Sequence, residues 1–227
     1  MPRNKADVAK GRIMDSSKPT TPQPLSTIFA VDDDDVTCAM LKRLGQSLNL
    51  PVLTYASAES FLNDFRNQPG CLVADIHLGG MSGLDLQQEL LKRGATLPII
   101  MITAKAQVPM AVKAMHNRAV DFLEKPFDIT VLGQRIRQAI ELDQTLRAKA
   151  AQTADAVQRL SRLTPREREI MQFVVKGMSN KQMAAQLQLS EKTIEVHRGN
   201  VMRKTAAESV AELVRLSMSA PAPEKTS

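Results

Sequence analysis

The chain has 227 residues, a formal net charge of +6 and 43% hydrophobic residues, enough for two modest domains that each bury a core. It contains no run of roughly 20 apolar residues that would cross a bilayer, and its N-terminus lacks the apolar segment of a secretory signal. Neither Cys38 nor Cys71 belongs to a disulfide or metal-binding spacing. We therefore expect a cytoplasmic protein without a membrane partner, and exclude a secreted disulfide-rich scaffold.

The charge is unevenly distributed along the chain. Residues 26–127 carry nine Lys and Arg against eleven Asp and Glu, whereas residues 161–217 carry ten against six. A slightly acidic module joined to a basic one is typical of proteins whose second domain binds nucleic acid.

Residues 1–25 are predicted to be a disordered basic extension, because they contain Lys5, Lys10, Arg12 and Lys18 among prolines and show almost no apolar periodicity. Over residues 26–143, short apolar runs alternate with amphipathic stretches, which predicts an α/β domain. The predicted strands are Thr27–Val31, Val52–Tyr55, Cys71–Ala74, Leu97–Ile102 and Val120–Leu123. The predicted helices between them are Val36–Leu48, Ala58–Asn67, Gly83–Arg93 and Pro109–Asn117. Such units build a parallel sheet with helices on both faces.

The second half of the chain is predicted to be helical. The apolar pattern of Ile129–Leu160 has no strong breaker, so the last helix of the first domain is expected to continue into a helical linker over residues 144–160. Residues 161–217 predict a small four-helix domain, with capping boxes at Thr164–Glu167 and Ser179–Gln182 and a further cap at Ser190. Residues 218–227 are predicted to be a flexible tail.

Polar residues stand at the ends of four predicted strands. Asp32 and Asp33 follow the first strand, Asp75 the third, Thr103 the fourth and Lys125 the fifth. Open parallel sheets bind ligands at this carboxyl edge. Mg²⁺ is held by carboxylates, waters and phosphate oxygens, and phosphoryl transfer needs a nucleophile, a cation and a fixed ammonium group. The set therefore predicts a metal-dependent phosphate site, because crowded carboxylates repel one another without a cation.

Single polar residues also have simpler interpretations. A lone aspartate after a strand is more often a helix cap, and we assign Asp34 and Asp35 to that role. His77 could be a side-chain metal ligand, but no second histidine or cysteine stands at ligand spacing. His116 and His197 are equally isolated.

Several motifs resemble the receiver domain of two-component response regulators. They are Val31-Asp-Asp-Asp34, Leu72-Val-Ala-Asp75 with Met81-Ser-Gly83, Met101-Ile-Thr103 and Asp121-Phe-Leu-Glu-Lys-Pro-Phe127. The resemblance covers residues 26 to about 145 and implies a flavodoxin-like fold of strand order 2-1-3-4-5. It implies that Asp75 is the phosphoacceptor of a sensor histidine kinase. It further implies the Mg²⁺ ligands Asp33, Asp75 and the backbone carbonyl of His77, with Asp32 acting through water and Lys125 pairing with the phosphate.

The same resemblance implies a switch, in which Thr103 moves toward the phosphoryl group and Phe122 turns inward. The Lys125–Pro126 bond is expected to be cis. His77 and Lys105 occupy positions that tune the lifetime of the phosphorylated state in this family.

The chain departs from the family pattern at two places. Gly79 stands where proline is usual and Gly80 follows it, which predicts a looser loop. Arg118 stands where glycine is common, and a positive φ there would cost arginine on the order of 1 kcal/mol.

Residues 179–204 divide into a short helix, a tight turn at Gln188–Ser190 and a second helix, the pattern of a helix-turn-helix whose second helix enters the major groove. Ile194, Val201 and Met202 are expected to face the core. On their charge alone, the basic residues of this segment would more often belong to a solvated helix face than to a DNA contact.

The motifs Leu163–Glu169, Gly177–Lys181, Ser190–Ile194 and Val196–Arg198 resemble the LuxR-type DNA-binding domain, and both domains together resemble the FixJ branch of response regulators. This resemblance implies that Glu195, Val196 and Gly199 read base edges and that Asn180, Lys181, Thr193 and Arg198 contact the DNA backbone. From their side chains alone, Lys181, Lys192, Thr193, Arg198 and Lys204 can meet phosphates. Glu195 either accepts from a cytosine amino group or orients Arg198.

We therefore predict a transcription factor without enzymatic turnover, which is phosphorylated on Asp75, pairs through the face around residues 110–125 and binds DNA as a homodimer. RNA polymerase is a further expected partner. Two other classes stay open: a phosphate-independent DNA-binding protein with the first domain as a dimerisation scaffold, and a regulator that sequesters a protein partner.

Overall fold

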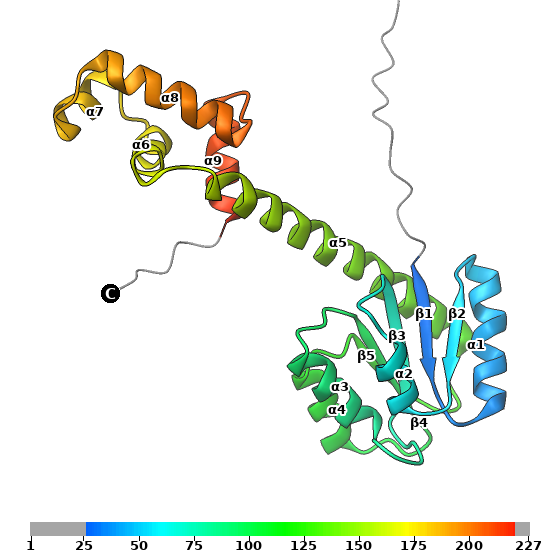
Figure 1. Ribbon diagram of the computed structural model, residues 1–227. Helices are drawn as coiled ribbons and strands as arrows, with labels where there is room; N and C mark the ends of the chain where they lie inside the picture. The colour runs from blue at the N-terminus through cyan, green and yellow to red at the C-terminus, as the bar shows by residue number, and fades with distance from the viewer. Residues whose placement is uncertain (1–25, 221–227) are drawn as a thin grey trace, which may run out of the picture.

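The structure, a computed structural model, describes residues 26–220 (Figure 1). The predictions for residues 1–25 and for 221–227 lie outside the described residues. Within the part described, no helix is both long and apolar enough to cross a membrane.

Five parallel strands form one sheet in the order β2-β1-β3-β4-β5. They are β1 (Thr27–Val31), β2 (Val52–Tyr55), β3 (Gly70–Asp75), β4 (Ile99–Thr103) and β5 (Asp121–Glu124). The predicted flavodoxin-like order is confirmed. β4 begins at Ile99 rather than Leu97, because Pro98 has no N–H to donate and only its carbonyl joins the pairing, accepting from Leu72 at 2.9 Å.

Helices cover both faces of this sheet. They are α1 (Asp35–Leu48), α2 (Ala58–Asp64), α3 (Gly83–Lys92), α4 (Val108–His116) and the first turns of α5 (Ile129–Ser161). α2 is shorter than predicted, since Phe65 is extended and Asn67 has a φ of 62°. Asp34 caps α1 by accepting from the N–H groups of Val36 and Thr37, as expected for an aspartate that follows a strand.

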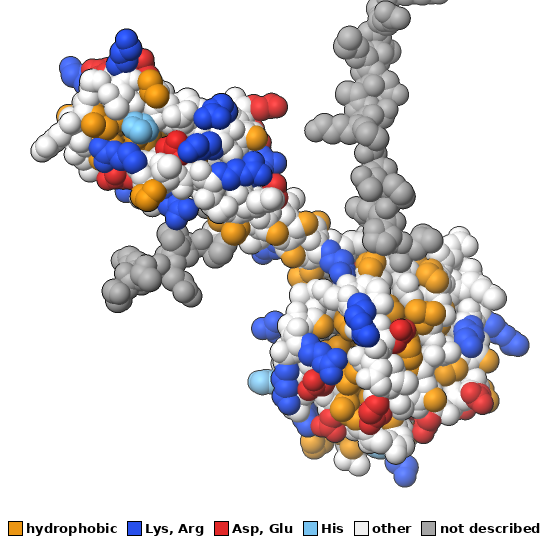
Figure 2. Space-filling view, viewed as in Figure 1, with side chains coloured by type: hydrophobic (Ala, Val, Ile, Leu, Met, Phe, Trp, Pro, Cys, Tyr) orange, Lys and Arg blue, Asp and Glu red, His pale blue; other side chains and the backbone are white. Residues whose placement is uncertain are grey.

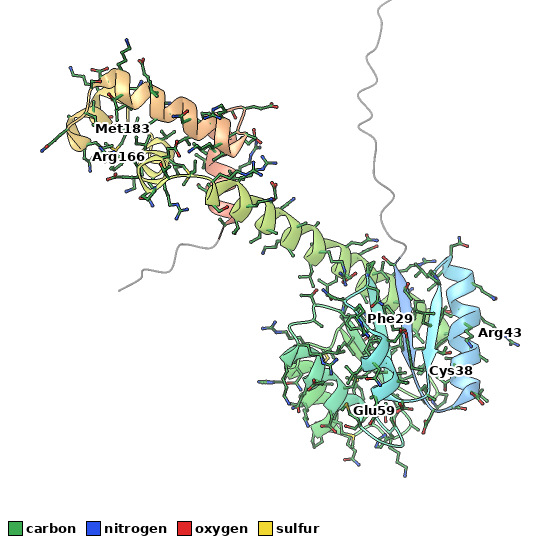
Figure 3. All side chains as sticks on the ribbon, viewed as in Figure 1. Phe29, Cys38, Arg43, Glu59, Arg166 and Met183 are labelled. Atoms are coloured by element: carbon green, nitrogen blue, oxygen red, sulfur yellow. The ribbon has the colours of Figure 1, made fainter. Side chains whose placement is uncertain are left out.

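The alternation of side chains along the strands produces two apolar layers. Phe29 of β1 faces α2 and packs edge-on against Phe61 and Phe65, with ring centroids 5.7 and 5.6 Å apart (Figure 3). Ile28, one position earlier, lies in the opposite layer with Leu41 of α1 and residues of α5. All six residues of β3 are buried, which explains its uninterrupted apolar run.

α5 is a single 33-residue helix that leaves the first domain and reaches the second (Figure 1). The predicted linker, residues 144–160, lies inside it. Ala156 is only 1% exposed and Leu160 packs against the core of the second domain, so the end of α5 belongs to that core.

The second domain contains α6 (Pro165–Val175), α7 (Asn180–Leu187), α8 (Glu191–Thr205) and α9 (Val210–Ser219). Thr164 and Ser179 form the predicted capping boxes, and Ser190 caps α8. Met183 lies in the core with Ile194 and Val201 (Figure 3). α9 runs to Ser219, two residues into the predicted tail, and Ala220, which precedes Pro221 in sequence, is extended.

Candidate functional site

The carboxyl edge of the sheet brings together residues that are far apart in sequence. Lys125, after β5, places its Nζ 2.7 Å from Asp32 Oδ2 and 2.7 Å from Asp75 Oδ2. These pairs join residues 93 and 50 positions apart. The predicted convergence of Asp32, Asp75 and Lys125 is thus present in the structure.

Burial and charge oppose each other within this cluster. Burial raises the pKa of Asp32 and outweighs the hydrogen bond from Lys125, and the neighbouring Asp75 raises it further. Burial lowers the pKa of Lys125, but the hydrogen bonds and charges of Asp32 and Asp75 outweigh it and raise the pKa overall. Lys125 therefore stays charged, but its ammonium group already pairs with two carboxylates, so a further anion at this edge would need an additional cation.

Asp33 stands beside this cluster and is exposed, and its Oδ2 faces Gly79 of the loop after β3. No group of three or more His, Cys, Asp or Glu side chains in residues 26–220 is arranged to hold a metal ion on its own. A cation at this edge would therefore need backbone oxygens and water in addition to carboxylates, which is the ligand set that Mg²⁺ accepts.

The loop between β3 and α3 is anchored at several points despite Gly79 and Gly80. The N–H of His77 donates to Asp75 Oδ1 at 2.8 Å, and the N–H of Met81 donates to Glu59 Oε1 at 2.9 Å. The Met81 N–H lowers the pKa of Glu59, which projects from α2 (Figure 3). Glu59 was not predicted as a site residue, because a glutamate 22 residues before its partner carries no local sequence signal.

Thr103 closes β4 and is fully buried. Its Oγ1 lies 3.0 Å from His77 Nδ1 and accepts from the Lys105 N–H at 3.2 Å. Phe122, on the neighbouring β5, is half-buried against the layer that contains α4.

Two backbone expectations for this domain are present in the structure. Arg118 has a φ of 68°, the left-handed conformation that favours glycine. The Lys125–Pro126 peptide bond is cis.

α7 and α8 form the helix-turn-helix, joined through Gln188, which has a left-handed φ of 54°. Ile194 and Val201 are buried and Met202 is half-buried, which fixes the face of α8 that packs on the core. The opposite face points to solvent within the described residues. That face exposes Glu195, Gly199 and Val196, which is 59% exposed. Figure 2 shows several Lys and Arg side chains on the face of the domain that carries α7 and α8.

The candidate phosphate contacts differ in their surroundings. Lys181 and Lys192 are exposed. Arg198 of α8 donates to Asn180 Oδ1 of α7 at 2.5 Å, which links these two helices. Thr193 Oγ1 lies 2.7 Å from the hydroxyl oxygen of Ser190, the residue that caps α8. Lys204 instead places its Nζ 2.6 Å from Glu167 Oε2, so its charge is already balanced within the domain.

Sequence reasoning also missed a buried pair on α5. The Asp143 side chain is fully buried and accepts from the Gly70 N–H at 2.9 Å. Arg147 donates to both Asp143 oxygens at 2.8 Å, and to the carbonyls of Asn67 and Gln68 at 2.8 and 2.9 Å. The i to i+4 spacing of Asp143 and Arg147 predicts that they pair on one helix. It does not predict that they also bind the backbone of residues 67–70.

Two family models match the chain, the response regulator receiver domain at residues 28–137 and the bacterial regulatory proteins of the luxR family at residues 161–217. The chain is 41% identical over 192 residues to response regulator protein TodT of Pseudomonas putida, with 84% of this chain and 85% of TodT covered. It is 38% identical over 194 residues to transcriptional regulatory protein FixJ of Bradyrhizobium diazoefficiens, with 85% and 95% covered.

Among solved structures, response regulator StyR is similar over 86% of this chain and 99% of its own, with a TM-score of 0.79 and 38% identity. The matches to both domains and across the helix between them agree with the order of elements in the structure. The chain belongs to the LuxR-type two-component response regulators, transcription regulators in which a receiver domain precedes a helix-turn-helix DNA-binding domain.

Proposed function

We propose that Asp75 accepts a phosphoryl group from a sensor histidine kinase, and that this event controls pairing of two chains and their binding to DNA. The observation that carries the proposal is the position of the Asp75 carboxylate, which lies at the open edge of the sheet within 2.7 Å of a lysine ammonium group. A carboxylate beside a fixed cation is a suitable nucleophile for phosphoryl transfer.

In the transfer, a carboxylate oxygen of Asp75 forms a bond to phosphorus as the bond between phosphorus and the kinase histidine breaks. Lys125 neutralises charge on the phosphoryl oxygens, since its ammonium group already contacts Asp75. Mg²⁺ would be held by Asp33, Asp75 and the His77 carbonyl, with Asp32 acting through water, and would neutralise further phosphoryl charge.

The proposed response lies on α4. Thr103 turning toward the phosphoryl group would let Phe122 move inward, beside α4. The outer side of this helix carries an unburied apolar stripe, with Val108 78%, Val112 62% and Met115 49% exposed. Exposed apolar patches of this kind mark interaction surfaces, and pairing of two receivers here would cover them.

Pairing would place two helix-turn-helix units on one two-fold DNA site and raise affinity through effective concentration. In each unit Glu195, Val196 and Gly199 would face base edges, while Asn180, Lys181, Lys192, Thr193 and Arg198 would contact the backbone. Lys204 could bind a DNA phosphate only by breaking its ion pair with Glu167. The bound dimer would act on transcription through RNA polymerase.

The first test replaces the acceptor. Asp75→Asn should abolish Mg²⁺-dependent labelling by a small phosphodonor and prevent the tighter operator binding that the donor induces in the parent chain. Asp85→Asn is the matched control and should be labelled normally, because the Asp85 carboxylate accepts from the hydroxyl of Ser82, the residue that caps α3. An Asp75→Asn chain that still pairs on addition of the donor would refute the mechanism and favour a constitutive scaffold.

The second test concerns DNA. Lys192→Ala should weaken binding to all sequences alike and reduce the slope of log affinity against log salt by about 1. Glu195→Ala should change base preference instead, since base edges carry the sequence information. DNA affinity without steep salt dependence would contradict the proposal and favour sequestration of a protein partner.

A further inference from the structure

The hydrogen bonds of Thr103 point to a role for His77. Thr103 Oγ1 accepts from the Lys105 N–H at 3.2 Å and lies 3.0 Å from His77 Nδ1. The Lys105 carbonyl is farther from Oγ1, at 3.4 Å. The hydroxyl proton is therefore best placed to donate to Nδ1 when the imidazole carries its proton on Nε2.

Thr103 has one hydroxyl proton, and this restricts what the residue can do. Both His77 Nδ1 and a phosphoryl oxygen are acceptors for that proton, so Thr103 cannot donate to both. We propose that His77 is a positioning residue that holds Thr103 in the position it takes before phosphorylation. Phosphorylation of Asp75 must then break the bond between His77 and Thr103 before Thr103 can turn.

The same residue is joined to the phosphoacceptor. The backbone N–H of His77 donates to Asp75 Oδ1 at 2.8 Å, while its side chain reaches Thr103. His77 thus contacts the acceptor carboxylate through its backbone and the residue proposed to respond to it through its side chain. Because the bond is present in only one of two states, it shifts their populations even when no phosphate is bound.

The inference rests on the proposed function but concerns the chain before phosphorylation, so it is separate from any effect of His77 on the lifetime of the acyl phosphate. One neutral hydrogen bond of ordinary strength shifts such an equilibrium by roughly 2- to 10-fold. His77 is exposed, so its truncation leaves no cavity in the core and the variant should fold.

The experiment uses the full chain with Asp75→Asn, in which no acyl phosphate can form. Adding His77→Ala should tighten self-association roughly 4- to 100-fold, because each of the two pairing chains gains the 2- to 10-fold shift, as measured by analytical ultracentrifugation. His77→Asn is the matched control, because its Oδ1 can replace Nδ1 as acceptor, and it should restore the weaker association. Unchanged association in His77→Ala would overturn the proposal.

A double-mutant cycle tests whether the effect passes through Thr103. In a chain that also carries Thr103→Ala, His77→Ala should no longer change self-association. An equal change in both backgrounds would show that His77 acts by another route and would refute the proposal.

The Thr103 methyl resonance of the full chain separates failure of this proposal from failure of the proposed function. His77→Ala should move that resonance toward its position in the phosphorylated parent, whether or not chains pair. A resonance that does not move refutes the role of His77 even where a phosphodonor still drives pairing. A parent that fails to pair with the donor refutes the proposed function alone.

Discussion

Lys125 illustrates how one side chain can define the chemistry of a sheet edge. Its ammonium group contacts Asp32 and Asp75 at 2.7 Å each, and both carboxylates are buried. Two buried carboxylates without a cation would repel each other and shed charge by protonation. The lysine keeps Asp75, the proposed phosphoacceptor, beside a positive charge that can neutralise an incoming phosphoryl group.

In the second domain, Glu167 forms a comparable ion pair between residues far apart in sequence. Its carboxylate bonds Lys204 Nζ at 2.6 Å and accepts from the Thr164 N–H at 2.9 Å. The hydrogen bond from Lys204 is the main cause that lowers the pKa of Glu167 from 4.5 to about 2, and the Thr164 N–H adds to it.

This shift predicts the acid behaviour of the helical domain. Since the folded-state pKa is depressed, ionised Glu167 stabilises the fold above pH 4.5, and the stabilisation is lost as pH falls from 4.5 toward 2. Glu167→Gln should therefore lose less stability over that range, measured by hydrogen exchange of α6 and α8 amides. Glu169→Gln, which removes only a surface ion pair with Arg166, is the control and should keep the parent's acid dependence.

At the scale of elements, α5 is fixed to the receiver by Asp143 and Arg147. The guanidinium group binds Asp143 and two carbonyls of the loop between α2 and β3, and Asp143 holds the Gly70 N–H. Gly70 admits no side chain, because a Cβ would meet the Thr27 carbonyl oxygen at 1.9 Å. Arg147 lies in the predicted linker, yet these contacts make it part of the receiver.

Removing Arg147 should destabilise the receiver, because Asp143 would remain buried without its cation. We expect Arg147→Ala to lower the free energy of unfolding by about 3 kcal/mol. The single tyrosine, Tyr55, lies in the receiver and the chain has no tryptophan, so Tyr55 fluorescence during urea unfolding reports this domain.

Arg137→Ala provides the comparison, since Arg137 is exposed on the same helix. Its effect should stay within about 0.5 kcal/mol. Equal unfolding midpoints for the two variants would show that Arg147 does not fix α5.

For the whole molecule, the continuous α5 is the connection between the two domains (Figure 1). Arg147 binds the receiver near one end of the exposed stretch, and Leu160 packs against the core of the helical domain at the other. A helix held at both ends should transmit the orientation of the receivers to the DNA-binding units. A flexible tether would bring the two DNA-binding units close together without fixing their orientation.

Interrupting α5 should distinguish a rigid connection between the domains from a flexible one. Ala151→Pro, in the exposed part of α5, removes a helix hydrogen bond and clashes with the preceding turn, at a cost of about 3 kcal/mol. Both domains should stay folded, while spin labels at Arg43→Cys and Lys176→Cys should give a wider distance distribution than in the parent.

The native thiols do not interfere with this labelling. Both are buried, and burial raises the pKa of Cys71 to about 12, which suppresses the reactive thiolate. Ala151→Gln keeps the helix and is the control. An equally wide distribution in that control would show that α5 bends without a proline.

The sequence alone determined the order of elements, the caps and the residues at the carboxyl edge. Strand ends can be read from apolar runs, and all parallel strands present the same end at one edge, so Asp32, Asp75 and Lys125 had to converge there. Capping residues act on the backbone three positions away, which is why Thr164, Ser179 and Ser190 were predictable.

Only the tertiary structure decided which side chains pair across the fold. Glu59 with Met81, His77 with Thr103 and Lys204 with Glu167 are 22 to 37 positions apart, and Arg147 reaches a carbonyl 80 positions away. Periodicity reports that a face is buried but not what buries it, because a hydrogen bond depends on distance and direction between elements. The proposed control of Thr103 and the attachment of α5 both arise at this level.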